Sequence, residues 1–277
     1  MTIDQIIAEA LKEDLGGGDH SSLSTIPKTA QGKAQLIAKE EGVIAGLEVA
    51  QKVFMAVDSK IKFKKFVSDG NYVKPKDVIF EVEGSSISLL SAERLALNFM
   101  QRMSGIATKT RQMVTLLDGL NTKLLDTRKT TPLLREIEKY SVKIGGGENH
   151  RFGLYDMIMI KDNHIDFAGG ITQAIKATNT YLHQENLNLK IEIEVKDMEE
   201  IEEVLRIGSI HRIMFDNFTP ELMKQAVERV GGRFETEASG GITEKTLRAY
   251  AETGVDYISV GALTHHIKSL DLSLRAL

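Results

Sequence analysis

Apolar and polar residues follow one pattern before about Leu120 and another after it. In the first region, helical spacing alternates with strand-like runs bounded by turn signals such as Ser68-Asp69-Gly70-Asn71. This region is predicted to be mixed and strand-rich, and its last helix is expected to bend or break at Ser104-Gly105. Helices are predicted at residues 2–14, at 47–57 and from Ser91 onward, and strands at 33–40, 60–67 and 78–82.

After Leu120, short apolar strands alternate with helices. This alternation is typical of parallel βαβ units, because two parallel strands need a crossover connection. Six or seven such units suit a small α/β barrel. Strands are predicted at 123–125, 157–160, 191–195, 213–215, 234–238 and 257–260, and helices at 172–185, 198–205, 220–230 and 244–252.

A polar or glycine-rich group follows strand after strand in the second region. In α/β barrels the active site gathers at the carboxyl ends of the strands, so this recurrence predicts an enzyme with its site at that edge. The groups are Asp126-Thr127-Arg128-Lys129, Lys161-Asp162-Asn163-His164, Glu194, Asp216-Asn217, Ser239-Gly240-Gly241 and Gly261-Ala262.

Positive charge is concentrated between Arg128 and His164. This stretch holds seven Lys/Arg and five Asp/Glu, a local charge of +2, whereas the whole chain carries −4. Arginine and lysine side chains bind carboxylates and phosphates, so the stretch indicates a small polyanionic ligand. A nucleic-acid-binding module is disfavoured, because the basic residues are not striped along one face. The candidate ligands of the anion are Arg128, Lys129, Arg151 and Lys161.

Composition narrows the function classes further. The chain of 277 residues has no cysteine, which excludes disulfides, a thiolate nucleophile and a cysteine metal site. No apolar run approaches the ~20 residues of a membrane span, and residues 1–5 lack a signal-peptide pattern. These features predict a cytoplasmic protein without a membrane segment.

Two carboxylates and two histidines are further candidates. Glu194 and Asp216 end consecutive strands, so we expect them side by side, where they hold Mg²⁺ or stabilise a developing cation. His150 and His164 are interpreted as ligands, proton donors or structural histidines, and their spacing disfavours a zinc site.

Glycines supply a third kind of candidate. Backbone N–H groups in Gly145-Gly146-Gly147 and Ser239-Gly240-Gly241 can cradle oxyanions. The second group ends a strand and precedes a helix, and with Gly261-Ala262 it matches the phosphate site that barrels often build there.

The ordered set of motifs resembles the quinolinate phosphoribosyltransferase family over nearly the whole chain. The resemblance is densest from Asp126 to His164. It implies an α/β fold, with an N-terminal α/β sandwich containing an antiparallel sheet (1–110, joined by the tail 266–277) and an incomplete parallel α/β barrel (111–265). The other matching motifs are Glu13-Asp14-Leu15-Gly16, Glu93-Arg94-Leu95-Ala96-Leu97-Asn98, Ser104-Gly105-Ile106-Ala107-Thr108, Glu237-Ala238-Ser239-Gly240-Gly241-Ile242 and Val260-Gly261-Ala262-Leu263-Thr264-His265.

The resemblance also implies a reaction and a set of roles. The phosphoribosyl group of phosphoribosyl pyrophosphate passes to quinolinate with decarboxylation, in NAD biosynthesis, with Mg²⁺ and no organic cofactor. The enzyme is expected to be a homodimer in which Arg102 reaches the partner's site. Thr127, Arg128, Lys129, His150, Arg151 and Lys161 would line the quinolinate pocket, Glu194 and Asp216 would face the ribose and the metal, and Ser239, Gly240, Gly241, Gly261, Ala262 and His265 would surround the phosphate. The catalytic residues would be Lys129, Lys161, Glu194 and Asp216.

Some residues depart from the family's usual pattern, and other functions stay open. Leu133 follows Pro132 where glycine is common, which affects the shape of the loop more than its chemistry. A related phosphoribosyltransferase, including a nicotinate-specific one, is the nearest alternative. A Schiff-base aldolase with Lys161 as nucleophile is a second.

Overall fold

The computed structural model describes residues 1–277 and divides them into two compact units. Unit 1 comprises Met1–Arg111, Thr130–Gly146 and Ala262–Leu277, and unit 2 comprises Gln112–Lys129 and Gly147–Gly261. The segment Thr130–Gly146 lies within the predicted barrel domain but belongs to unit 1. None of the helices combines the length and the apolar composition that a membrane crossing requires.

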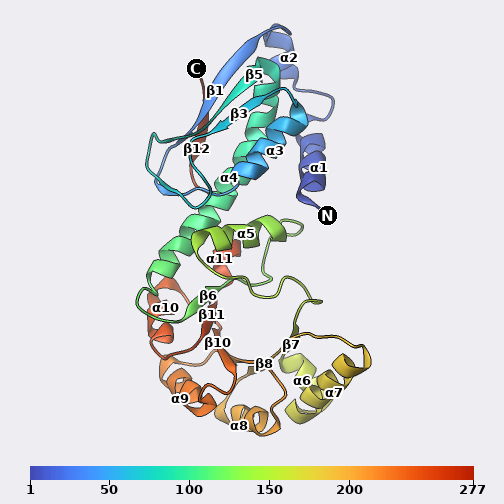
Figure 1. The fold of residues 1–277 in the computed structure, drawn as a ribbon, viewed down its shortest axis with the longest axis vertical. Helices are drawn as coiled ribbons and strands as arrows, with labels where there is room; N and C mark the ends of the chain where they lie inside the picture. The colour runs from blue at the N-terminus through green and yellow to red at the C-terminus, as the bar shows by residue number, and fades with distance from the viewer. The chain divides into compact units, whose positions relative to one another are not determined.

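Unit 1 is built on a four-stranded antiparallel sheet with the order β12-β1-β5-β3 (Figure 1). The three strands expected in this region are confirmed, and the last strand of the chain, which the pattern did not predict, pairs with the first, with Leu274 opposite Leu36. The strands are β1 (Gln31–Ala38), β3 (Lys62–Lys65), β5 (Val78–Ser85) and β12 (Leu272–Ala276), and a separate two-stranded ribbon is formed by β2 (Gly42–Val43) and β4 (Tyr72–Val73).

The first helix of unit 1 starts with hydrogen bonds between side chains and backbone that cap its N-terminus. The Thr2 side chain accepts from the Gln5 N–H, and the Gln5 side chain accepts from the Thr2 N–H, which forms a capping box at the start of α1. The predicted helices at 2–14 and 47–57 are confirmed. The helices are α1 (Ile3–Leu15), α2 (His20–Thr25), α3 (Leu47–Val57), α4 (Ser86–Thr115), α5 (Arg135–Gly145) and α11 (Ala262–His265).

Helix α4 runs without a break through Ser104-Gly105, so a break at that point is wrong. A Cβ on Gly105 would lie 2.3 Å from the carbonyl oxygen of Lys268. The glycine therefore allows the chain near Lys268 to pass close against an intact helix. The pattern of small residues marked a packing site, and helical hydrogen bonding continued across it.

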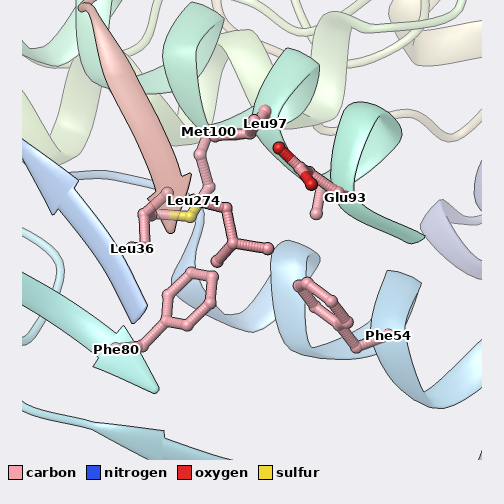
Figure 2. A pocket seen from close by; sticks show the side chains of 8 residues that line it. Leu36, Phe54, Phe80, Glu93, Leu97, Met100 and Leu274 are labelled. Atoms are coloured by element: carbon pink, nitrogen blue, oxygen red, sulfur yellow. The ribbon is translucent and has the colours of Figure 1, made fainter. Parts of the chain in front are cut away.

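The core of unit 1 lies between this sheet and helices α3 and α4. Figure 2 shows Leu36, Phe80 and Leu274 from three strands facing Phe54 of α3 and Met100 of α4. All five belong to the core of this unit or line it, and the rings of Phe54 and Phe80 meet edge to face with centroids 5.9 Å apart. Apolar alternation in β1 and β5 thus anchors the sheet to the helices.

Unit 2 holds a six-stranded parallel sheet with the order β6-β11-β10-β9-β8-β7. The helices α8, α9 and α10 lie along the outside of the curved sheet (Figure 1). Beyond β6 there is only an isolated bridge from Leu125 to Glu148, so the barrel is incomplete, as expected. The strands are β6 (Lys123–Leu125), β7 (Ile158–Ile160), β8 (Ile191–Val195), β9 (Arg212–Asp216), β10 (Glu235–Ser239) and β11 (Tyr257–Ser259), and the helices are α6 (Asp162–Ala168), α7 (Ile171–Gln184), α8 (Met198–Ile207), α9 (Pro220–Val230) and α10 (Glu244–Ala251).

All six strands and four of these helices match the prediction to within about two residues, a normal spread for element ends. Helices α5 and α6 are the elements of the basic stretch that the sequence pattern did not predict. Helix α6 has only 7 residues and none of them is buried, so its apolar period is weak. Helix α5 has 11 residues and buries Ile137 and Val142, so a helical pattern was present there and was not recognised.

Candidate active site

The carboxyl ends of the parallel strands bring several predicted site residues to one edge of unit 2. Glu194 is next to last in β8, Asp216 is the last residue of β9, and Ser239 is the last residue of β10. Asp216 and Ser239 are register partners, and Glu194 is paired with Met214, two residues before Asp216. Because strands in a parallel sheet end on the same side, these polar side chains share that edge.

Two guanidinium groups lie near each other in the basic segments. Burial, and then the positive charge of Arg128, lower the pKa of the Arg151 guanidinium, while Glu192 and Asp156 oppose that shift. The Arg151 side chain donates to the carbonyl oxygen of Met157 at 3.2 Å, a neutral acceptor. Two neighbouring cations, one of them bonded to a neutral group, form a place where an anion is favoured.

Asp126 connects the segment that carries Arg128 with the segment that carries Arg151. Its carboxylate is fully buried and accepts the backbone N–H of His150 at 2.9 Å through Oδ1. Its Oδ2 accepts the Asn149 side-chain amide at 2.5 Å. Since Asp126 directly precedes Thr127-Arg128-Lys129, this carboxylate fixes the chain before Arg151 against the chain that carries Arg128.

Lys161 links the end of β7 to the neighbouring strand. Its ammonium group forms an ion pair with Glu194, whose side chain is 13% exposed. The Lys161 backbone N–H donates to Nδ1 of His164 at 2.9 Å at the start of helix α6. His164 is exposed, and its ring caps the start of this helix.

His150 faces two buried carboxylates and not the edge itself. Its Nε2 lies 2.9 Å from Oε2 of Glu192 and 3.3 Å from Oε2 of Glu237, and both carboxylates are fully buried. Glu237 also accepts from Nη1 of Arg212 at 2.8 Å. Burial and the charge of Glu237 raise the pKa of the Glu192 carboxyl to about 7.

The proton of the His150 ring lies on Nε2, the nitrogen that faces the two carboxylates. Burial lowers the pKa of the imidazole, but the contacts with Glu192 and Glu237 outweigh burial and raise that pKa to about 9. The Arg151 backbone N–H, however, donates to Nδ1 at 2.6 Å. The raised pKa favours the doubly protonated imidazolium, but a proton on Nδ1 would set two donors against each other at that distance. We therefore assign the neutral ring, with its single proton on Nε2, facing the carboxylates.

Two groups of side chains have donor atoms that a metal ion uses. The ligand atoms of His150, Glu192 and Glu237 all lie within 4.8 Å of one another, but a metal on Nε2 would put the ring proton on Nδ1, where the Arg151 backbone N–H already donates. Glu194 and Asp216 offer carboxylate oxygens, the hard donors that Mg²⁺ takes together with water and phosphate oxygens. Asp216 accepts from the Asn217 side chain at 2.7 Å, and Glu194 pairs with Lys161. This donor set fits Mg²⁺.

The two glycine groups play different parts. A Cβ on Gly240 would lie 2.2 Å from Oδ1 of Asn217, and φ is +97° at Gly240, so only glycine suits the turn after β10. This turn leads to Thr243, the residue before α10. Gly145, in contrast, ends α5 in a tight fit, where a Cβ would lie 2.5 Å from Thr110. Its role is therefore packing within unit 1.

Sequence profiles of one family match both parts of the chain. The profile described as "Quinolinate phosphoribosyl transferase, N-terminal domain" matches residues 19–104, and the C-terminal domain profile matches residues 106–275. The chain belongs to the quinolinate phosphoribosyltransferase family.

Relatives of this family are similar over almost the whole chain. A chloroplastic nicotinate-nucleotide pyrophosphorylase (carboxylating) from Oryza sativa is 48% identical, covering 98% of this chain and 76% of the relative. A mitochondrial quinolinate phosphoribosyltransferase (decarboxylating) from Nicotiana glauca is 44% identical, covering 98% and 81%. The crystal structure of NadC from Streptococcus pyogenes is 41% identical, covers 99% of this chain and 97% of that chain, and has a TM-score of 0.94.

Three of the predicted site residues belong to unit 1, whereas Glu194, Asp216 and Ser239 belong to unit 2. Ala262 and His265 lie in helix α11, and Arg102 lies in α4. The Arg102 side chain donates to the fully buried Glu138 carboxylate through Nε and Nη2, at 2.8 and 2.6 Å. It also donates to the Thr131 hydroxyl at 2.7 Å and the Thr264 carbonyl at 3.2 Å. Their roles in a family site stay predictions.

The sequence did not mark as main candidates four polar residues that contact predicted site residues or their partners. Glu138 had no signal, because its partner Arg102 is 36 residues away. Glu192 lies on the same strand as the candidate Glu194 but farther from its carboxyl end, and neither it nor Glu237 nor Arg212 was a main candidate. A signal existed for the two glutamates: Glu192/Glu194 and Glu235/Glu237 each put two acids on one face of a strand, and in β8 the other residues are all apolar.

Proposed function

We propose that this chain transfers the phosphoribosyl group of phosphoribosyl pyrophosphate to quinolinate, with loss of CO₂ and pyrophosphate, to give nicotinate mononucleotide. The names of the Oryza and Nicotiana relatives support the reaction class. The observation that carries the proposal is the pair of neighbouring cations, Arg128 and Arg151, of which Arg128 follows the carboxyl end of β6.

The basic residues suit a planar dianion. Quinolinate has two carboxylates, and the forked guanidinium groups of Arg128 and Arg151 can bind carboxylates in a bidentate way. Each charge-assisted hydrogen bond contributes about 1.5–3 kcal/mol. This offsets the cost of removing the carboxylates from water. Thr127, Lys129 and Lys161 complete the pocket, and Lys129 and Lys161 act as catalytic cations. His150 is buried and acts from beneath the pocket, as its 8% exposure supports.

The carboxylates serve the second substrate. As pyrophosphate leaves, positive charge builds on the ribose, and Glu194 and Asp216 stabilise that charge through space. A Mg²⁺ ion held by these carboxylates would neutralise charge on the leaving pyrophosphate. Lys161, paired with Glu194, keeps that carboxylate oriented before substrate binds.

The turn after β10 receives the phosphate of the phosphoribosyl group. Ser239, Gly240 and Gly241 supply a hydroxyl and backbone N–H groups at the start of α10, where the helix dipole favours an anion. The positive φ of +60° at Gly241 supports a concave backbone there. By the family resemblance, Gly261, Ala262 and His265 contribute to the same phosphate site.

Decarboxylation follows from the chemistry of the product. Once the ring nitrogen bonds to C1 of the ribose, the pyridinium ring accepts electron density from the bond between C2 and its carboxylate. That bond breaks, CO₂ leaves, and a proton takes its place on C2. The ring is its own electron sink, so the step needs no organic cofactor.

The assembly and location are proposed from the sequence. We infer a homodimer in which Arg102 serves the partner's site, and a cytoplasmic enzyme. The exposure of 29% for the Arg102 side chain supports a surface role in addition to its bonds with Glu138.

Product analysis tests the proposal. Quinolinate, phosphoribosyl pyrophosphate and Mg²⁺ are incubated with the protein, and mass spectrometry should detect nicotinate mononucleotide and the loss of one CO₂ per turnover. Nicotinate in place of quinolinate is the control for a related transferase, and borohydride trapping with a carbonyl substrate is the control for an aldolase. Turnover of nicotinate alone, or a trapped adduct on Lys161, would refute the proposed function.

A further inference from the structure

Buried charges occupy one face of the unit 2 sheet, at a depth where barrels are usually filled by branched aliphatic side chains. Glu192 and Glu237 are 0% exposed and Arg212 is 9% exposed. Replacing buried ion pairs with apolar residues of similar size is often neutral or stabilising. The stability of the sheet therefore does not account for these three residues.

The three residues form a connected series of contacts that ends at a substrate-binding residue. Nη1 of Arg212 donates to Oε2 of Glu237, at 2.8 Å. Oε2 of Glu237 and Oε2 of Glu192 lie 3.3 and 2.9 Å from Nε2 of His150. On the other side of the ring, Nδ1 accepts the Arg151 backbone N–H at 2.6 Å.

We propose that Glu192, Glu237 and Arg212 are positioning residues, which through the His150 ring fix the backbone of Arg151 for binding of the substrate carboxylate. This inference rests on the proposed function for the role of Arg151. A rotated imidazole would release the Arg151 N–H, and a shift of about 1 Å at a binding group is enough to reduce turnover strongly.

The other groups around the series support positioning. The buried Asp126 carboxylate holds the His150 backbone N–H at 2.9 Å, so the backbone and the ring of His150 are both fixed. Arg212 is held on its other side by Glu235, with Nε and Nη2 at 3.2 and 3.0 Å from Oε2. The guanidinium of Arg212 also stacks on the Tyr257 ring, 4.0 Å from its centroid. The series therefore starts from a rigid anchor.

Glu237→Gln tests the inference, because the amide keeps the size of the side chain and removes its charge. We expect the quinolinate KM to rise about tenfold while the KM of phosphoribosyl pyrophosphate changes less than about twofold. Hydrogen exchange of the Arg151 amide should speed up in the free protein, since its acceptor is less well held. Met214→Leu is the matched control: Met214 is buried and is the register partner of Glu237, but lies outside the series.

The same substitution in an Arg151→Ala protein separates a positioning role from a general loss of structure. In Arg151→Ala, Glu237→Gln should add less than about twofold to the quinolinate KM, because the residue that it positions is already gone. Equal losses in both backgrounds, or equal rises in both substrates' KM values, would mean a structural role. An unchanged exchange rate at Arg151 would also overturn the inference. This exchange measurement needs no substrate, so it remains decisive even if the wild-type protein fails to use quinolinate, which would refute the proposed function alone.

Discussion

Arg102→Ala should destabilise unit 1, whatever Arg102 contributes to catalysis. The Glu138 side chain is 0% exposed, and Arg102 supplies two of the hydrogen bonds to its Oε1 atom. After the substitution, Oε2 keeps the Thr131 backbone N–H at 3.2 Å, but the buried charge loses its cation. The Thr131 hydroxyl also loses its bond to Nη2.

The size of the effect follows from burial. Removing one partner of a fully buried ion pair costs about 3–5 kcal/mol. The Arg102 side chain is 29% exposed, so water can reach part of the vacated space, and we expect about 2–3 kcal/mol. For a domain of 150–250 residues this corresponds to a fall in Tm of roughly 4–12 °C.

Urea unfolding followed by far-UV circular dichroism, at one fixed protein concentration, measures the change. Arg94→Ala is the matched control, because Arg94 is an exposed arginine of the same helix, and its loss should cost less than about 0.5 kcal/mol. The double variant Arg102→Met with Glu138→Leu should recover most of the loss, since no buried charge is left unpaired. If Arg102→Ala and Arg94→Ala unfold at the same urea concentration, the pair does not stabilise the fold and this reasoning is wrong.

Three further predictions concern the reaction. Asp216→Asn should lower kcat at least about tenfold and change the quinolinate Kd, measured by calorimetry, less than about threefold, because the charge acts in the transition state; a raised Kd with normal kcat would contradict that role. Excess EDTA should abolish transfer and added Mg²⁺ should restore it, with far-UV circular dichroism unchanged; activity that persists in EDTA would argue against the metal site. Arg102→Ala and Lys161→Ala subunits, mixed at a temperature below the lowered Tm, should recover about a quarter of wild-type activity, because half the dimers are mixed and each of these has one intact site of two. No recovery despite verified subunit exchange would mean that Arg102 does not act on the partner.

The parallel sheet and its polar edge could be predicted because both depend on local sequence. Most strands of unit 2 are short, largely apolar runs that alternate with helices, and the edge of the sheet at which Asp216 or Ser239 lies follows from strand direction alone. Glycine was harder to interpret. Gly105 signals a break on propensity, but the carbonyl of Lys268, which no local pattern reveals, requires a glycine within an intact helix.

Contacts between distant residues explain the other differences. Strand β12 pairs with β1 across more than two hundred residues of sequence, and its apolar period is too short to predict a strand by itself. In the same way, the sequence marks His150 as a candidate, but only the fold shows that its ring lies between the carboxylates of Glu192 and Glu237. Motifs identify residue types, whereas burial and partners decide what each residue does.

The partners of the arginines make this difference concrete. In sequence, Arg151 is a candidate anion ligand within the basic stretch and Arg102 matches a family motif, whereas Arg212 carries no motif. In the structure, Arg102 and Arg212 each donate to a fully buried glutamate, so their charges are already balanced within the protein. Arg151 donates to a carbonyl oxygen, and burial, followed by the charge of its neighbour Arg128, lowers the pKa of its guanidinium. A cation whose hydrogen bond goes to a neutral group, next to another cation, gains most from an incoming carboxylate. Of these three arginines, Arg151 is therefore the one whose charge the fold leaves for a ligand to balance.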